Sequence, residues 1–348
     1  MIAHRLGGHR SLVSVSRTRR VLESCVVLGF TAAVLGCAPA ASEAAADLAQ
    51  NRSGTVQVTN IEIAGPAADR APAHPNPAPP NPAHPNRVGS ERVKLRSYEP
   101  AIEAGGRPWA TLVWAHGGSF VRGTLDWPEA DWVARQFAEA GVRVYSVDYV
   151  LASEVVKAPA PANDVAAVLD WAAERAEPDM PLVVGGASAG AHLATVAALD
   201  RAVDALLLEY PTLHRVQRPD AAVAAATAGL PEQRRFDAER IAEMYAFYLG
   251  EGAADAGATA ALVAGELPPE RLRGLPPTVM VHADADDLRT SGEQFAEQLR
   301  AAGVPVSEAI QPGTVHGYMN RPEESARALA DANATIDSFV SELRRVLS

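Results

Sequence analysis

The most informative segment of the chain is Leu182-Val183-Val184-Gly185-Gly186-Ala187-Ser188-Ala189-Gly190-Ala191-His192-Leu193. A short apolar run meets Gly-x-Ser-x-Gly and then continues into a helix-compatible pattern of alanine and leucine. Small residues two positions before and after a serine allow a sharp strand-to-helix turn, which exposes the serine hydroxyl at the carboxyl edge of a sheet. Ser188 is therefore the candidate nucleophile. Because a glycine-rich turn of any α/β domain gives a similar pattern, this interpretation depends on partners elsewhere in the chain.

Strand and helix patterns alternate on both sides of this turn. Apolar strand runs cover residues 111–115, 142–147 and 205–210 and begin again at residue 278, and helical periodicity covers residues 132–140, 164–174 and 188–199. This alternation predicts an α/β fold with a mostly parallel central sheet and helices on both faces. Alternating residues within 56–63 and 93–98 predict an antiparallel pair that opens the sheet, and residues 305–310 predict the last strand.

A second glycine turn, His116-Gly117-Gly118, follows the strand run 111–115. Backbone N–H groups of such a turn can converge on one point, and a tetrahedral intermediate needs donors of this kind for its oxyanion. We therefore expect an oxyanion hole made of the amides of Gly117, Gly118 and Ala189, the residue after the candidate nucleophile.

An acid and a base follow in the order that a serine nucleophile requires. Three aspartates, Asp284, Asp286 and Asp287, lie in an acidic turn after the strand that begins at residue 278. His316 comes after the last predicted strand, between two glycines. One of the three aspartates can orient His316, which can take the proton of Ser188. These residues alone leave the choice among the aspartates open.

With these motifs in place, residues 55–348 resemble the bacterial hormone-sensitive-lipase-like esterases of the α/β-hydrolase fold. The resemblance implies that Asp286 is the acid, because Asp286-Asp287-Leu288-Arg289 matches the Asp-Pro-Leu-Arg of that family. The histidine of its Val-His-Gly motif matches His316. The remaining matches are the oxyanion motif at 116–118, the strand end at 148–152 and the serine turn at 186–190. Three residues depart from the family pattern. Ser119 stands where a third glycine is usual, Val150 where the family has Arg, and Ala187 where it often has Asp or Glu.

Residues 214–270 interrupt the alternation with an alanine-rich, helical pattern. We expect a small helical lid insertion over the carboxyl edge of the sheet, and a pair of packing helices is the alternative. The insertion is short and has few bulky aromatic residues, so it favours short acyl chains over long ones.

The N-terminal segment has the pattern of a bacterial lipoprotein. Basic residues precede an apolar run of about ten residues, which suits a signal peptide and is too short to span a bilayer. Val34-Leu35-Gly36-Cys37 resembles a lipobox, which implies a signal peptide at 1–36 and a diacylated Cys37. We expect a flexible tether at 37–54, a hydrolase domain at 55–348 and a proline-rich loop at 65–87. Such a protein would be exported, and lipid-anchored at the outer face of the bacterial cell membrane or in the periplasm.

Composition limits the kinds of partner. The chain is 48% hydrophobic and 21% charged, as soluble globular proteins are, and its net charge of −11 argues against nucleic acid or anionic headgroups as ligands. We expect membrane contact through the lipid anchor only. His74 and His84 lie in the proline-rich loop without further candidate ligands, so neither a metal site nor a cofactor is expected.

The sequence therefore predicts a carboxylesterase-type serine hydrolase that cleaves small esters with short acyl groups. Two alternatives remain. Ser-Ala-Gly-Ala-His-Leu at 188–193 also resembles the kynurenine formamidases, so an aryl formamide is a second candidate substrate. A non-catalytic surface binding protein is the third interpretation, because one fold serves many functions.

Overall fold

A twisted sheet of eight strands forms the centre of the fold in a computed structural model, which describes residues 55–66, 89–102, 106–250 and 263–348. Its spatial order is β1-β2-β4-β3-β5-β6-β7-β8, with β1 and β2 antiparallel to their neighbours and the other pairs parallel. The strands are β1 (Gln57–Ala64), β2 (Arg92–Glu99), β3 (Ala110–Ala115), β4 (Val142–Asp148), β5 (Leu182–Ala187), β6 (Ala205–Glu209), β7 (Thr278–Ala285) and β8 (Val306–Val315). The predicted α/β fold is confirmed.

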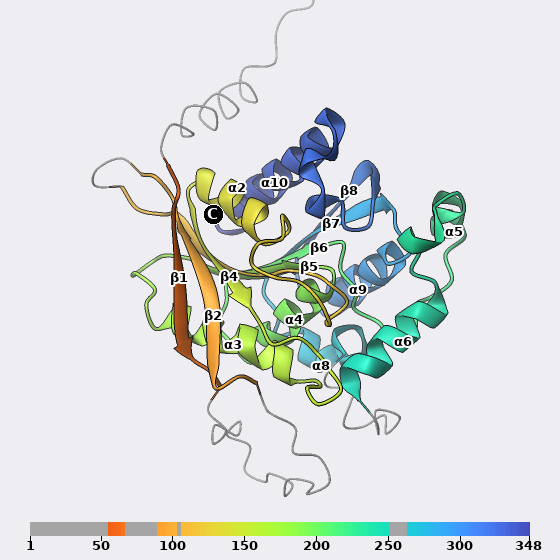
Figure 1. The fold of residues 1–348 in the computed structure, drawn as a ribbon, viewed down its shortest axis with the longest axis horizontal. Coiled ribbons are helices and arrows are strands. Elements are labelled where there is room, and N and C mark those ends of the chain that lie inside the picture. The colour runs from red at the N-terminus through yellow and green to blue at the C-terminus, as the bar shows by residue number, and fades with distance from the viewer. Residues whose placement is uncertain (1–54, 67–88, 103–105, 251–262) are drawn as a thin grey trace, which may run out of the picture. The chain divides into compact units, whose positions relative to one another are not determined.

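Helices cover both faces of this sheet (Figure 1). One face carries α2 and α10, which contact each other, and the other carries α3, α4 and α9. The helices are α2 (Asp131–Glu139), α3 (Ala160–Ala173), α4 (Ala189–Ala198), α5 (Ala221–Thr227), α6 (Ala238–Leu249), α8 (Pro269–Leu272), α9 (Arg289–Ala301) and α10 (Ala326–Val346). No helix among the described residues is long and apolar enough to cross a membrane.

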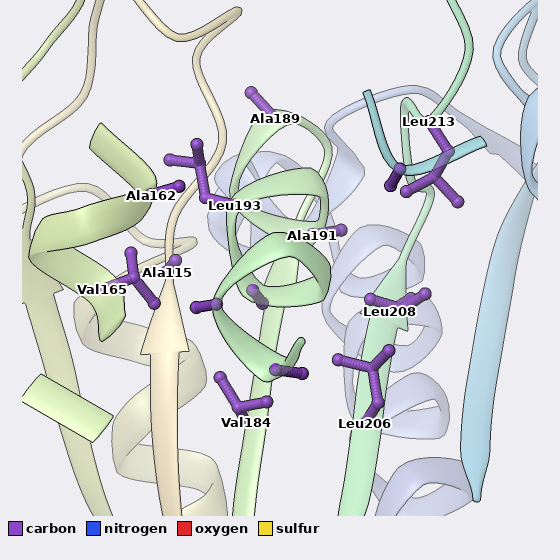
Figure 2. Packing of buried hydrophobic residues seen from close by; sticks show 14 of the residues in the cluster. Ala115, Ala162, Val165, Val184, Ala189, Ala191, Leu193, Leu206, Leu208 and Leu213 are labelled. Atoms are coloured by element: carbon purple, nitrogen blue, oxygen red, sulfur yellow. The ribbon is translucent and has the colours of Figure 1, made fainter. Parts of the chain in front are cut away.

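Helix α4 lies in the middle of one apolar layer, and its small residues allow it to approach the sheet closely. Figure 2 shows Ala191 and Leu193 of this helix near Val184 of β5, with Leu206 and Leu208 of β6 alongside. Strands β3 and β5 are buried along their whole length because helices cover both of their faces, which explains their continuous apolar runs. This packing fixes the turn between β5 and α4, which carries Ser188.

Four elements differ from the sequence prediction. Strand β8 extends to Val315 instead of ending at residue 310, and its register against β7 shifts between Ala283 and Ala285. Helix α3 begins at Ala160, since a proline is tolerated in the first turn of a helix. Helix α9 and the C-terminal helix α10 were not predicted, although their buried residues recur at helical spacing.

Other predicted segments lie outside the described residues. These are the signal peptide at 1–36, Cys37 and the tether at 37–54, and nearly all of the proline-rich loop at 65–87 with His74 and His84. The 214–270 insertion is described except for residues 251–262. It contains α5, α6 and the start of α8, and Figure 1 shows α5 above α6 along the right-hand edge of the fold.

Candidate active site

Ser188 occupies the sharp turn between β5 and α4 with φ 53° and ψ −117°. A positive φ is unfavourable for a residue with a side chain and costs about 1–3 kcal/mol, which the surrounding packing must offset. A Cβ on Gly190 would lie 2.1 Å from the carbonyl oxygen of Ala115, and one on Gly186 would lie 2.5 Å from the same atom. The two glycines are therefore required by the close approach of the turn to the end of β3.

A continuous line of hydrogen bonds joins the predicted serine, histidine and acid. Ser188 Oγ lies 3.0 Å from His316 Nε2, and His316 Nδ1 lies 2.7 Å from Asp286 Oδ2. Asp286 is 1% exposed, and its other oxygen accepts the N–H of Leu288 at 2.9 Å. These contacts bring together residues from the ends of β5, β7 and β8 at the carboxyl edge of the sheet.

The neighbouring aspartates have other partners. Asp284 accepts the N–H of Gly313 at 2.9 Å and pairs with Arg289. Asp287 accepts the N–H of Phe236 at 2.8 Å and pairs with Arg235. Of the three aspartates left open by the sequence, Asp286 is the one that contacts His316.

Two aromatic rings pack edge-on against the imidazole of His316. The ring of Tyr210, which follows β6, is centred 4.8 Å away, and that of Phe236, in the 214–270 insertion, is 4.7 Å away. These contacts restrict the rotation of the imidazole and keep Nε2 directed toward Ser188.

A buried carboxylate, Glu129, supports the glycine turn. It is 1% exposed, accepts the N–H of Gly117 at 2.5 Å and accepts the hydroxyl of Tyr210. Burial and the nearby charge of Glu129 raise the pKa of Tyr210 well above its ordinary value, so this hydroxyl stays protonated and donates. Because the N–H of Gly117 already has this acceptor, the geometry argues against its predicted place in an oxyanion hole.

A cavity of about 320 Å³ opens beside Ser188 and His316. Gly118 and Ser119 line it, and both have positive φ, 116° and 54°. The 214–270 insertion contributes Gln233, Arg234, Phe236 and Arg240 to its wall. The other residues of the wall are Arg122, Trp127, Pro128, Glu129, Gly317, Asn320 and Arg321. The sequence motifs indicated neither Glu129 nor these arginines.

Comparison with known proteins identifies the family of the chain. A family model described as the α/β-hydrolase fold matches residues 112–320. The carboxylic ester hydrolase LipN of Mycobacterium tuberculosis is 30% identical over 303 residues, which cover 84% of this chain and 72% of that protein. The esterase LipI of the same organism is 34% identical over 263 residues, 72% of this chain and 78% of that protein.

A solved structure shows the same fold. Brefeldin A esterase, described as a bacterial homologue of human hormone-sensitive lipase, superposes with a TM-score of 0.64 at 22% identity. The match covers 88% of this chain and 84% of that one.

Proposed function

Because the chain belongs to the α/β-hydrolase family and is a carboxylesterase-type serine hydrolase, we propose that it cleaves short-chain carboxylic esters through an acyl-enzyme on Ser188. The observation that carries this proposal is the hydrogen-bonded line from Ser188 through His316 to Asp286. The interpretation of the chain as an enzyme is confirmed over that of a non-catalytic binding protein by relatives named as ester hydrolases.

In the proposed reaction, His316 carries protons between Ser188, the leaving alcohol and water. Ser188 Oγ attacks the ester carbonyl carbon while its proton passes to His316 Nε2. The resulting imidazolium, oriented and charge-balanced by Asp286, donates this proton to the departing alkoxide, which leaves as an alcohol. A water molecule then attacks the acyl carbon while His316 Nε2 takes its proton. As the bond between the acyl carbon and Ser188 Oγ breaks, His316 donates this proton to Oγ, and the carboxylic acid leaves.

The oxyanion hole is proposed to consist of the amides of Gly118, Ser119 and Ala189. Gly118 and Ser119 line the cavity, and Ala189 begins helix α4, where the N–H groups of the first turn have no acceptor within the helix. Ser119 thus replaces Gly117 in the predicted set, because Glu129 accepts the Gly117 N–H.

A preference for short acyl groups is part of the proposal. The cavity of about 320 Å³ is at the small end of the range for ligand pockets. Its wall includes the polar side chains of Gln233 and Asn320, which a long alkyl chain would leave without water.

The test is hydrolysis of p-nitrophenyl esters by purified wild-type protein and variants. We expect Ser188→Ala and His316→Ala each to lower kcat on the acetate by roughly 10⁴-fold or more, because the triad acts as a unit. Asp286→Asn should cause a large loss, and the matched control Asp284→Asn a much smaller one. Rates should fall from acetate to palmitate.

Two results would contradict the proposal. One is near wild-type turnover by a folded Ser188→Ala or His316→Ala protein. The other, which concerns chain length alone, is a steady rise in rate toward palmitate. Labelling by a fluorophosphonate should be seen in the wild-type protein and lost in Ser188→Ala.

A further inference from the structure

Positive charge is concentrated in the wall of the cavity beside Ser188. Four arginines line it, Arg122, Arg234, Arg240 and Arg321, and Glu129 is the single acidic residue among the described residues of the wall. The carboxylate of Glu129 already accepts two hydrogen bonds, one from a backbone N–H and one from a tyrosine hydroxyl. Since the whole chain has a net charge of −11, this local excess of cations is opposite to the average of the molecule.

These arginines have few anionic partners. Arg122 and Arg234 form no side-chain hydrogen bond or ion pair with any residue that the structure describes. Arg240 lies over the ring of Phe236 at 4.3 Å and donates to the backbone carbonyl of Arg235. Arg321 is the exception, with its Nε 3.2 Å from Glu324 Oε2.

Arginines of the same segment that do not line the cavity are paired with carboxylates. Arg235 pairs with Asp287 at 2.9 Å, and Arg215 forms a close pair with Glu266. The lack of carboxylate partners is therefore a property of the cavity wall and not of the 214–270 insertion as a whole.

Two of the cavity arginines repel each other. Burial and the nearby charge of Arg234 lower the pKa of Arg321 from its ordinary value. Like charges held together in a partly buried wall are unfavourable, and an anion placed between them removes that repulsion. Planar guanidinium groups also bind a carboxylate through two parallel hydrogen bonds.

The cations lie near the reacting groups. Arg240 stacks on Phe236, whose ring packs 4.7 Å from that of His316, and an Arg321 Nη2 lies 3.5 Å from the His316 carbonyl oxygen. An ester bound at Ser188 in so small a cavity would thus have its remaining groups beside these guanidiniums.

We propose that the substrate is a small ester that carries a carboxylate, bound by Arg234 and Arg321 with Arg240 alongside. This inference rests on the proposed esterase function and narrows it to anionic esters. The carboxylate can belong to the acyl part, as in a monoester of a dicarboxylic acid, or to the alcohol part, as in an acylated hydroxy acid.

Two isosteric pairs of esters distinguish these sources. For the acyl part, monoethyl succinate is compared with ethyl succinamate, and for the alcohol part, acetoxyacetate is compared with acetoxyacetamide. Hydrolysis is followed by acid release at constant pH. In one pair, we expect kcat/KM of the anionic ester to exceed that of its amide by about tenfold or more. The reason is that hydrogen bonds from guanidinium groups to a carboxylate are stronger than those to a neutral amide. The pair that shows it identifies the source.

Variants and salt test whether the arginines cause this preference. Arg234→Gln and Arg321→Gln should each lower the ratio of anionic to amide rates severalfold. The control Arg175→Gln, which removes the same charge from an arginine stacked on Trp171 in α3, should leave the ratio unchanged. The ratio should also fall as NaCl rises from about 0.05 M to 0.5 M, because salt screens charge.

The wild-type ratios decide the matter even if a variant does not fold. Ratios near or below one in both pairs, with p-nitrophenyl acetate still hydrolysed, would overturn the anionic substrate and leave the esterase function standing. If the protein hydrolysed none of these esters, p-nitrophenyl acetate included, both the anionic substrate and the esterase function would be overturned.

Discussion

The single side chain of Glu129 connects the glycine turn with the surroundings of His316, the proposed base. Its carboxylate accepts from Gly117, beside the proposed oxyanion hole, and from Tyr210, whose ring packs on His316. It makes no step of the reaction itself, so we regard it as a positioning residue.

Replacing Glu129 by Gln should impair the chemical step more than binding. A glutamine has one acceptor oxygen, so one of the two buried donors would lose its partner at a cost of about 1–3 kcal/mol. We expect kcat on p-nitrophenyl acetate to fall roughly 10- to 100-fold with a smaller change in KM. Tyr210→Phe, which removes one donor only, is the comparison. An unchanged kcat in a folded Glu129→Gln protein would show that the turn keeps its position without this carboxylate.

Glu209 is a second buried acid, at the end of β6, and its effect is on stability. Burial raises the pKa of Glu209 well above its ordinary value, with Tyr318 as a polar neighbour. The contribution of protonated Glu209 to the free energy of unfolding is therefore complete below the unfolded pKa of about 4.3. It is lost as the pH rises toward and through the pKa of the folded state.

Replacement of Glu209 by Gln should consequently change the pH profile of stability. The Tm of the variant relative to wild type should rise as the pH increases above the unfolded pKa, since only the wild type must keep a proton that its unfolded chain releases. Thermal melts in buffers of matched ionic strength measure this difference. A Tm difference that is constant with pH would refute the assignment.

The sequence predicted the residues that belong to motifs and missed the others. Ser188 and His316 lie at turns whose glycines mark them. The order along the chain limited the acid to three aspartates, and the family resemblance implied Asp286. Glu129, Arg234 and Arg321 come from three separate segments without a shared pattern, and only the folded chain brings them to one cavity. Gly117 was a predicted donor because a glycine turn offers several amides, and no sequence pattern shows which of them a buried acid will accept.

Among the elements, the segment around Phe236 is held beside the site in part by the carboxylate of Asp287. Asp287 accepts from Thr227 Oγ1 at 2.7 Å, Arg235 Nε at 2.9 Å and the Phe236 N–H at 2.8 Å. Burial opposes ionisation of Asp287, but these donors outweigh it and hold its pKa below the ordinary value. The ionised form thus fastens α5 and Phe236 beside the end of β7.

Asp287→Asn should loosen this segment. An amide carries no charge and offers a single acceptor oxygen, so residues 227–236 should exchange amide hydrogens faster, and kcat/KM on small esters should drop about tenfold. Asp220→Asn, which alters only the cap of α5, is the control. Equal exchange rates in Asp287→Asn and wild-type protein would rule out the attachment.

Apolar periodicity predicted strands and helices well where burial is uniform, as in β3 and β5. It found β8 but ended the strand at residue 310, because Pro312 and Gly313 interrupt the pattern while pairing with β7 resumes at Val315. Neighbouring strands override local propensity here.

At the scale of the whole molecule, we propose that Cys37 anchors the domain to a membrane. Two acyl chains give stable binding at about 0.8 kcal/mol per buried CH₂. Metabolic labelling with a fatty acid should be abolished in Cys37→Ala and kept in Cys25→Ala, the only other cysteine of the chain. Recovery of unlabelled wild-type protein that still begins near Met1 would exclude both the anchor and export.

The close contact of the serine turn with the end of β3 bears on how relatives of this protein are to be sorted. Gly186 and Gly190 are fixed by the backbone of Ala115, whereas Ser188 is needed only for the proposed reaction. A descendant that ceased to be an enzyme would be free to replace the serine but would still need both glycines to fold. A search by the glycines therefore retrieves active and inactive descendants alike, and position 188 is the one to inspect in separating them.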